Sequence, residues 1–215
     1  MIQIDDAGSG SLIGGTCIGV MRAETGEFDF DIIPIDLYRP EYFEKKIYLD
    51  EVVRIIGKSF QKLSVEKKEQ IEVCRGYMFD RLRPWLKNNQ YQYINTSIDE
   101  PLQQKIENTF SQYVIQLGLP EQYINYTKYP FHFHRLLRWV YADYDKRKTL
   151  CKTGWKSWEK YGNLELEKKT GFLKHSRYKC LKCGESIKSE SPVEIIKYIS
   201  NRPNTIYMHI DCEKI

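Results

Sequence analysis

The chain has 215 residues, a formal net charge of +4 and 41% hydrophobic residues. This length suffices for one medium domain with a small appendage, and a core of that size does not need disulfides. The sequence shows no leader peptide and no apolar stretch long enough to cross a bilayer, so we expect a cytoplasmic protein without a membrane partner. Residues 1–145 hold 17 basic and 21 acidic side chains, whereas residues 146–215 hold 16 and 8. A basic end on an acidic body favours either a polyanionic partner or a solvated linker.

The first 35 residues predict three antiparallel strands. Apolar and polar residues alternate from Ile2 to Asp6 and again from Phe28 to Ile35, and a second run lies between them from Gly14 to Met21. Glycines lie between these runs, as is typical of turns that connect strands. The late Pro34 suits an edge strand or the end of a strand.

Helices and strands then alternate along the chain. Apolar residues recur at helical spacing between 41 and 63, between 102 and 117, and from Pro130 to Tyr144, and a short helix disturbed by Pro84 is predicted near Met78–Trp85. Brief strands are predicted at Ile71–Cys74 and Tyr91–Asn95. This order predicts an α/β fold with a mixed five-stranded sheet flanked by helices, in which the first strand lies beside the fourth.

Two short motifs carry a resemblance to a known family. Ile4-Asp5-Asp6-Ala7-Gly8-Ser9 is similar to the Asp-x-Gly-Ser opening of Holliday-junction resolvases, and Gln70-Ile71-Glu72-Val73 resembles their fourth strand. With the order of elements, these motifs resemble the ribonuclease H-like superfamily. The resemblance implies a two-metal-ion nuclease of DNA or RNA, in which carboxylates hold Mg²⁺ or Mn²⁺; oxygen ligands suit such hard cations.

The resemblance implies Asp6, Glu72 and Asp143 as the metal ligands, with Asp5 and Asp145 as neighbouring candidates. Strand alternation places Asp5 and Asp6 on opposite faces, and we prefer Asp6 because of the Asp-x-Gly-Ser match. Each acid taken alone is more often a turn, a cap or part of a solvated face. Since the sequence around Asp143 departs from the resolvase pattern, a non-cleaving adaptor that binds nucleic acid or protein is the alternative.

His132 and His134 precede the last predicted helix of this domain. They could contact a phosphate or move protons near neutral pH. Such an aromatic-rich stretch more often packs structurally.

A basic, aromatic segment follows the acidic body. Residues 146–188 contain thirteen Lys and Arg against four Glu, and cations with interleaved aromatic rings are typical of nucleic-acid contacts. The alternative is that the two tryptophans pack on the body and the lysines are merely solvated. The candidate nucleic-acid ligands are Lys146, Arg147, Lys148, Lys152, Trp155, Lys156 and Trp158.

The end of the chain predicts a zinc site. Cys180 and Cys183 are separated by two residues, as are His209 and Cys212, which gives a Cys₃His set suited to one tetrahedral, structural zinc ion. His175 is a less well spaced substitute. The intervening Ser191–Ile199 suggests a helix and Ile206–Met208 a strand, and the ending resembles treble-clef fingers, in which His-x₂-Cys opens a final helix.

These patterns divide the chain into a ribonuclease H-like domain at 1–148, a basic aromatic connector at 149–178 and a zinc-binding module at 179–215. The remaining cysteines, Cys17, Cys74 and Cys151, are expected to be reduced thiols.

Overall fold

The computed structural model describes residues 1–125, 128–175, 177–210 and 212. The chain forms two compact units. Unit 1 comprises residues 1–10 and 14–113, and unit 2 comprises residues 11–13 and 114–215. The division therefore falls earlier than the 148/149 boundary expected from charge and composition. Helices beyond residue 114 pack on the C-terminal strands, as the rings of Tyr141 and Tyr198 show, with centroids 4.6 Å apart.

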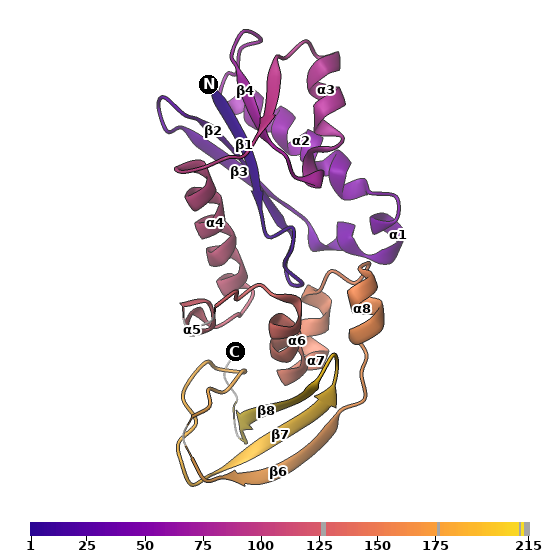
Figure 1. Ribbon diagram of the computed structural model, residues 1–215, viewed down its shortest axis with the longest axis vertical. Coiled ribbons are helices and arrows are strands. Elements are labelled where there is room, and N and C mark those ends of the chain that lie inside the picture. Colours follow the sequence, from indigo (N-terminus) through magenta and orange to yellow (C-terminus); the bar gives the residue numbers. More distant parts are fainter. Residues whose placement is uncertain (126–127, 176, 211, 213–215) are drawn as a thin grey trace. The chain divides into compact units, whose positions relative to one another are not determined.

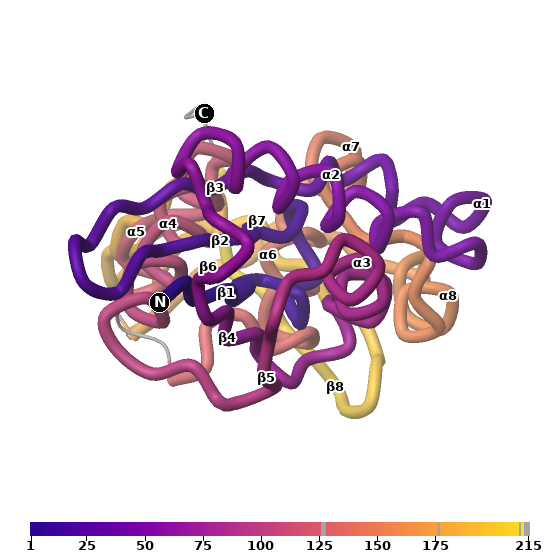
Figure 2. The backbone as a smooth tube through the Cα atoms, turned by 90° about the horizontal axis from the view of Figure 1, so that it is seen from above, coloured from indigo at the N-terminus to yellow at the C-terminus, as the bar shows by residue number. Residues whose placement is uncertain are grey.

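Unit 1 is built on a mixed sheet, which confirms the predicted α/β class and five-stranded sheet. The strand order is β3-β2-β1-β4-β5 (Figure 2). β2 pairs antiparallel with β1 and β3, whereas β4 pairs parallel with β1 and β5, so the first and fourth strands are neighbours as expected. The strands are β1 (Ile2–Ala7), β2 (Thr16–Arg22), β3 (Phe28–Ile33), β4 (Ile71–Cys74) and β5 (Tyr93–Thr96).

Helices cover both faces of this sheet (Figure 1). On one face, β1 and β4 bury Ile4 and Val73 in one core with Val52 and Ile56 of α2 (Ile47–Lys62), and α3 (Leu82–Asn88) joins this layer. On the other face lies α4 (Leu102–Gln116), whose Leu102 packs against the strands. Fully burying such side chains stabilises the fold by about 1.5–3 kcal/mol each.

The single helix predicted between 41 and 63 is divided in two. α1 (Pro40–Phe43) and α2 are separated at Lys46, whose φ of 54° is incompatible with a continuous right-handed helix. Short 3₁₀ turns, Ile35–Tyr38 and Tyr77–Phe79, precede α1 and α3.

Unit 2 combines short helices with a three-stranded antiparallel sheet of order β6-β7-β8. Its helical segments are α5 (Glu121–Asn125), α6 (Phe133–Ala142), α7 (Tyr144–Arg147), a 3₁₀ turn (Lys148–Leu150) and α8 (Lys156–Tyr161). Its strands are β6 (Glu167–Leu173), β7 (Ser191–Ile199) and β8 (Pro203–His209). No helix among the described residues has the length and apolar character required to span a membrane.

Two expectations about unit 2 were wrong. Ser191–Ile199 is a strand and not a helix, since β7 is the central strand paired with both β6 and β8, and its Val and Ile residues favour that pleated setting. The segment 149–178 is not only a connector, because it contains α8 and the edge strand β6.

Candidate functional sites

The predicted zinc ligands converge in unit 2. The ligand atoms of Cys180, Cys183, His209 and Cys212 all lie within 4.8 Å of one another. The Cys180 and Cys212 sulfurs are 3.7 Å apart, and the Cys183 sulfur lies 3.5 Å from Nδ1 of His209. Tetrahedral zinc with usual bond lengths requires separations of about 3.8 Å between sulfurs and about 3.5 Å from sulfur to nitrogen. The cluster is therefore compatible with a structural zinc ion.

A tight turn presents the first two cysteines. The Cys180 amide donates to the carbonyl of Glu185 at 2.8 Å, and the Gly184 amide donates to the carbonyl of Cys180 at 2.8 Å. Gly184 has a φ of +80°, and a Cβ there would lie 2.7 Å from Pro120. Both the backbone conformation and the close approach therefore require glycine at this position.

The environment of Cys180 favours its thiolate. Burial alone would raise the pKa of this thiol, but backbone amides of Cys183, His209 and Lys182 directed at the sulfur outweigh burial and lower the pKa. Burial and the neighbouring thiols raise the pKa of Cys212 to about 12. A dication at the centre would stabilise both thiolates.

Arg147 donates hydrogen bonds to the turn that contains Cys180 and Cys183. Its guanidinium donates to the carbonyls of Leu181 and Lys182 at 3.0 and 3.2 Å, and to the carbonyl of Trp139 at 2.7 Å. It also lies 4.0 Å from the centroid of the Trp139 ring. Burial lowers the pKa of Arg147 to about 10, so the side chain is still cationic at neutral pH. Arg147 was predicted to bind nucleic acid, but it is buried and structural.

The other predicted nucleic-acid ligands also divide by exposure. Lys152 is fully buried, with its amine 5.3 Å from the centroid of the Trp155 ring, so it too is unavailable to a polyanion. Lys146 and Lys156 are exposed. Lys148, Trp155 and Trp158 are half-buried, and Gly162 lies tightly against the Trp158 ring, where a Cβ would be 2.4 Å away.

In unit 1, Asp5 and Glu72 lie on the same face of the sheet. Gln3 pairs with Glu72 across the parallel strands and donates to its carboxylate at 3.0 Å. Asp5 is two residues beyond Gln3, so alternation places it on this face, diagonally next to Glu72. The Cys74 thiol, also on this face, donates a hydrogen bond to Asp5.

Asp5 is an unusually buried carboxyl group, with 7% of its surface exposed. Burial raises its pKa, and the negative charge of Glu107 on α4 adds to the shift. The hydrogen bonds from Cys74 and from the Asp6 amide, the latter at 2.9 Å, oppose this shift. The neighbours that set the pKa of Asp5 thus include no cation.

Asp6 lies on the opposite face, with the core that contains α2. A Cβ at Gly76 would lie 3.5 Å from Oδ1 of Asp6, and Asp6 contributes, after burial and Tyr48, to raising the pKa of Tyr77 to about 12. The structure therefore brings Glu72 together with Asp5 and separates it from Asp6, the aspartate preferred from the motif.

Asp143 and Asp145 belong to unit 2 and not to the five-stranded unit. Asp143 interrupts the predicted long helix, with a φ of −152° between α6 and α7, and its charge acts on the guanidinium of Arg147. Asp145 is exposed and pairs with Lys148 at 3.2 Å. No set of three carboxylates among the described residues converges as closely as the Cys₃His cluster.

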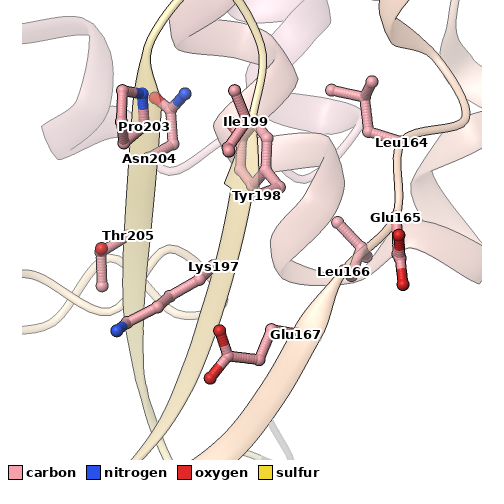
Figure 3. Close-up of a pocket in the computed structure, with 10 residues that line it drawn as sticks. All are labelled: Leu164, Glu165, Leu166, Glu167, Lys197, Tyr198, Ile199, Pro203, Asn204 and Thr205. Carbon is pink, nitrogen blue, oxygen red and sulfur yellow. The ribbon is translucent and has the colours of Figure 1, made fainter.

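Described residues of unit 2 also line pockets, two of which bear on function. The larger, of about 740 Å³, lies beside the β6–β7–β8 sheet, where Figure 3 shows Tyr198 and Ile199 with the side chains of Glu167 and Lys197. The register pairs Glu167 with Lys197, so a carboxylate and an amine lie side by side in the lining of this pocket. The smaller, of about 440 Å³, is lined by His132 just before α6, by side chains of α6 that include His134, and by residues of the β7–β8 turn and the start of β8.

Sequence reasoning overlooked several residues of these sites. Glu107 is exposed and follows Ile106, which lies with Leu102 and Phe110 on the buried face of α4, so its position next to that face could have been inferred from the helical spacing. Arg138 lines a pocket with residues of the β7–β8 turn. This proximity depends on the fold of unit 2, and no pattern in the sequence near Arg138 indicates it.

Comparisons with known proteins add no assignment. No protein-family model matches the chain, and no curated protein matches it significantly.

Proposed function

We propose that the chain is a divalent-metal-dependent phosphodiesterase of the ribonuclease H-like type, acting on DNA or RNA. The observation that carries the proposal is the placement of a buried carboxyl group, Asp5, on the face of the sheet shared with Glu72, where the charge of Glu107 also acts on it. A buried anion among other carboxylates is costly unless a cation offsets it. Three carboxyl groups from β1, β4 and α4 supply the oxygen ligands that Mg²⁺ or Mn²⁺ prefers.

The arrangement of the strands supports the same proposal. β1 and β4 are adjacent and parallel in the centre of the sheet, which is where the resembled superfamily carries its first two carboxylates. The ligand set proposed is Asp5 and Glu72 with Glu107, in place of Asp6 and Asp143. Bound there, the ion would polarise a phosphoryl oxygen and lower the pKa of its water ligand.

The test is cleavage of single-stranded, duplex, hybrid and branched nucleic acids with Mg²⁺ or Mn²⁺. We expect Asp5→Asn and Glu72→Gln each to reduce the rate by at least about a hundredfold, as loss of a positioned charged group in a catalytic site does. Asp36→Asn and Glu44→Gln change exposed acids of the same unit and should cleave at the wild-type rate. Equal rates in all five proteins would reject the site.

We further propose that the Cys₃His cluster holds one structural zinc ion. Its four ligand atoms lie within 4.8 Å of one another, and four protein ligands leave no open position for catalysis. Purified protein should therefore contain one zinc per chain, retained during phosphodiesterase assays. A zinc content near zero after purification without chelators would reject this assignment.

The second candidate function is a non-cleaving, nucleic-acid-binding adaptor. It is favoured by the absence of any three tightly converging carboxylates among the residues that the structure describes. Salt-sensitive binding without metal-dependent cleavage of any substrate in the panel would support this candidate over the phosphodiesterase.

A further inference from the structure

The smaller pocket of unit 2 has an unusual lining. Three guanidinium groups and two imidazoles surround it, and none of its lining residues carries a carboxylate. It is formed by the start of α6 and by the turn between β7 and β8. The basic residues of the lining are His132, His134, Arg135, Arg138 and Arg202.

The arginines of this lining have no carboxylate partner among the residues that the structure describes. None of the ion pairs between described residues involves Arg135, Arg138 or Arg202. Like charges held together in a concave site repel one another, and this cost is removed when an anion binds. The lining therefore carries excess positive charge, which an anionic ligand can neutralise.

Two buried nitrogen atoms of the lining have no hydrogen-bond partner within the described chain. They are Nε of Arg138 and Nδ1 of His134. Leaving such buried polar atoms unsatisfied costs about 1–3 kcal/mol each, so a small adjustment of these side chains that brought either nitrogen to an acceptor on a bound ligand would be favourable. Burial lowers the pKa of His134, and the charges of His132 and Arg202 lower it further.

The pocket is held in place by its own hydrogen bonds. Arg138 donates from Nη2 to the carbonyl of Thr205 at 3.0 Å. At the start of β8, the side-chain Nδ2 of Asn204 donates to the carbonyl of Arg202 at 2.7 Å and to Oγ of Ser200 at 3.1 Å. The binding groups are therefore preorganised, which reduces the entropy lost on binding.

The size of the pocket and its rim specify the ligand further. A volume of about 440 Å³ lies in the range of small-molecule sites and greatly exceeds one phosphate group. Tyr129 belongs to the lining and is 69% exposed, so its ring is available for stacking on a base. Guanidinium forks match phosphate oxygens in geometry and charge.

We infer that this pocket binds a phosphate monoester of nucleotide size, either a free nucleoside monophosphate or the phosphorylated end of a polynucleotide. Arg135, Arg138 and Arg202 bind the phosphate oxygens, His134 donates a hydrogen bond to them, and Tyr129 contacts the nucleoside. All these residues belong to unit 2, so the inference is independent of the carboxylates of unit 1.

The experiment uses calorimetry at about 0.15 M salt to measure the binding of three kinds of ligand. They are inorganic phosphate, a mixture of nucleoside monophosphates, and one short oligonucleotide prepared with a 5′-phosphate, with a 3′-phosphate or with two hydroxyl ends. We expect a phosphorylated ligand to bind at least tenfold more tightly than inorganic phosphate and than the oligonucleotide with hydroxyl ends. Comparison of the free nucleotides with the two phosphorylated oligonucleotides identifies the source of the phosphate.

The variant Arg135→Gln/Arg202→Gln removes two exposed cations and should weaken that binding at least tenfold, since hydrogen bonds to charged groups are the strong ones. The matched control is Lys168→Gln/Lys174→Gln, which removes the same charge from exposed positions of unit 2 outside the pocket. Thermal unfolding and zinc content report whether each variant is folded.

Three results would overturn the inference: equal binding of phosphorylated and hydroxyl ends, equal weakening by the two double variants, or inorganic phosphate binding as tightly as the nucleotides. The rate of nucleic-acid cleavage by Asp5→Asn is measured in a separate assay, and the phosphate binding of that variant is measured as well. Loss of phosphodiesterase activity with intact phosphate binding, or the reverse, therefore distinguishes failure of this inference from failure of the proposed function.

Discussion

Replacing Arg147 by methionine should destabilise unit 2 and loosen its zinc site. Methionine preserves most of the side-chain volume but leaves three carbonyls, those of Trp139, Leu181 and Lys182, without their donor. Hydrogen bonds to a charged group are worth about 1.5–3 kcal/mol each, and their energies are not additive. Breaking a buried charged network typically costs about 3–5 kcal/mol, and we expect a loss of that size in the free energy of unfolding.

The same change should act on the metal. Leu181 and Lys182 lie between the ligands Cys180 and Cys183, so the freed carbonyls belong to the turn that orients both sulfurs. Groups that orient ligands typically contribute about 10–100-fold to metal affinity. We therefore expect zinc to be lost to a colorimetric chelator at least tenfold faster from Arg147→Met.

The assays are urea-induced unfolding and the rate of zinc transfer to the chelator, with Lys146→Met as the matched control. Lys146 precedes Arg147 but is exposed, so its replacement should leave both measurements unchanged. Arg147→Lys keeps the charge but cannot span three acceptors, and should be intermediate. If Arg147→Met unfolds and releases zinc like the wild type, the structural role assigned to Arg147 is wrong.

Three further predictions concern single positions. Cys183→Ser should abolish stoichiometric zinc in purified protein whereas Cys151→Ala, which removes a buried thiol outside the cluster, should retain it; atomic absorption decides. Burial raises the pKa of Asp5 above 3.8, so ionisation of this carboxyl group disfavours the folded state. Without divalent ions, the wild type should therefore lose stability relative to Asp5→Asn as the pH rises from about 4 through the raised pKa. A stability difference that is the same at pH 4 and pH 7.5 in urea unfolding would contradict this. Gly8→Ala should lower the free energy of unfolding by at least about 2 kcal/mol, since Gly8 has a φ of +86° and a Cβ would lie 2.1 Å from the ring of Phe110; an unchanged unfolding midpoint would refute it.

The fold of unit 1 followed from local patterns because those patterns coincide with its packing. β4 covers the predicted Ile71–Cys74, and β1 lies beside it as the order of elements required. Strand alternation also placed Asp5 and Asp6 on opposite faces correctly. The preference for Asp6 relied on the motif, whereas the register that joins Gln3 to Glu72 places Asp5 on the face that Glu72 shares.

Unit 2 was harder to predict because its elements are stabilised by distant partners. The four residues of the Cys₃His cluster were identified from spacing alone, since two Cys or His pairs, each with a two-residue gap, are typical of metal sites and rarely arise by chance. Val193 and Ile196, three residues apart and both buried, imitate a helical face, so the strand β7 could be recognised only from its pairing with β6 and β8. Charge counting likewise could not reveal that Arg147 and Lys152 are buried.

The path of residues 11–13 through the molecule bears on how the two units can be separated. Leu12 accepts a hydrogen bond from the Lys152 amide at 2.8 Å, Ile13 bridges to Cys151, and both Leu12 and Ile13 are fully buried. A fragment beginning at residue 114 would lack this N-terminal contribution to its interior. During synthesis, residues 11–13 must likewise wait until residues 151–152 have left the ribosome before unit 2 can close. A circular permutant, or residues 114–215 supplied with a peptide that contains residues 11–13, is therefore the natural way to study unit 2 alone.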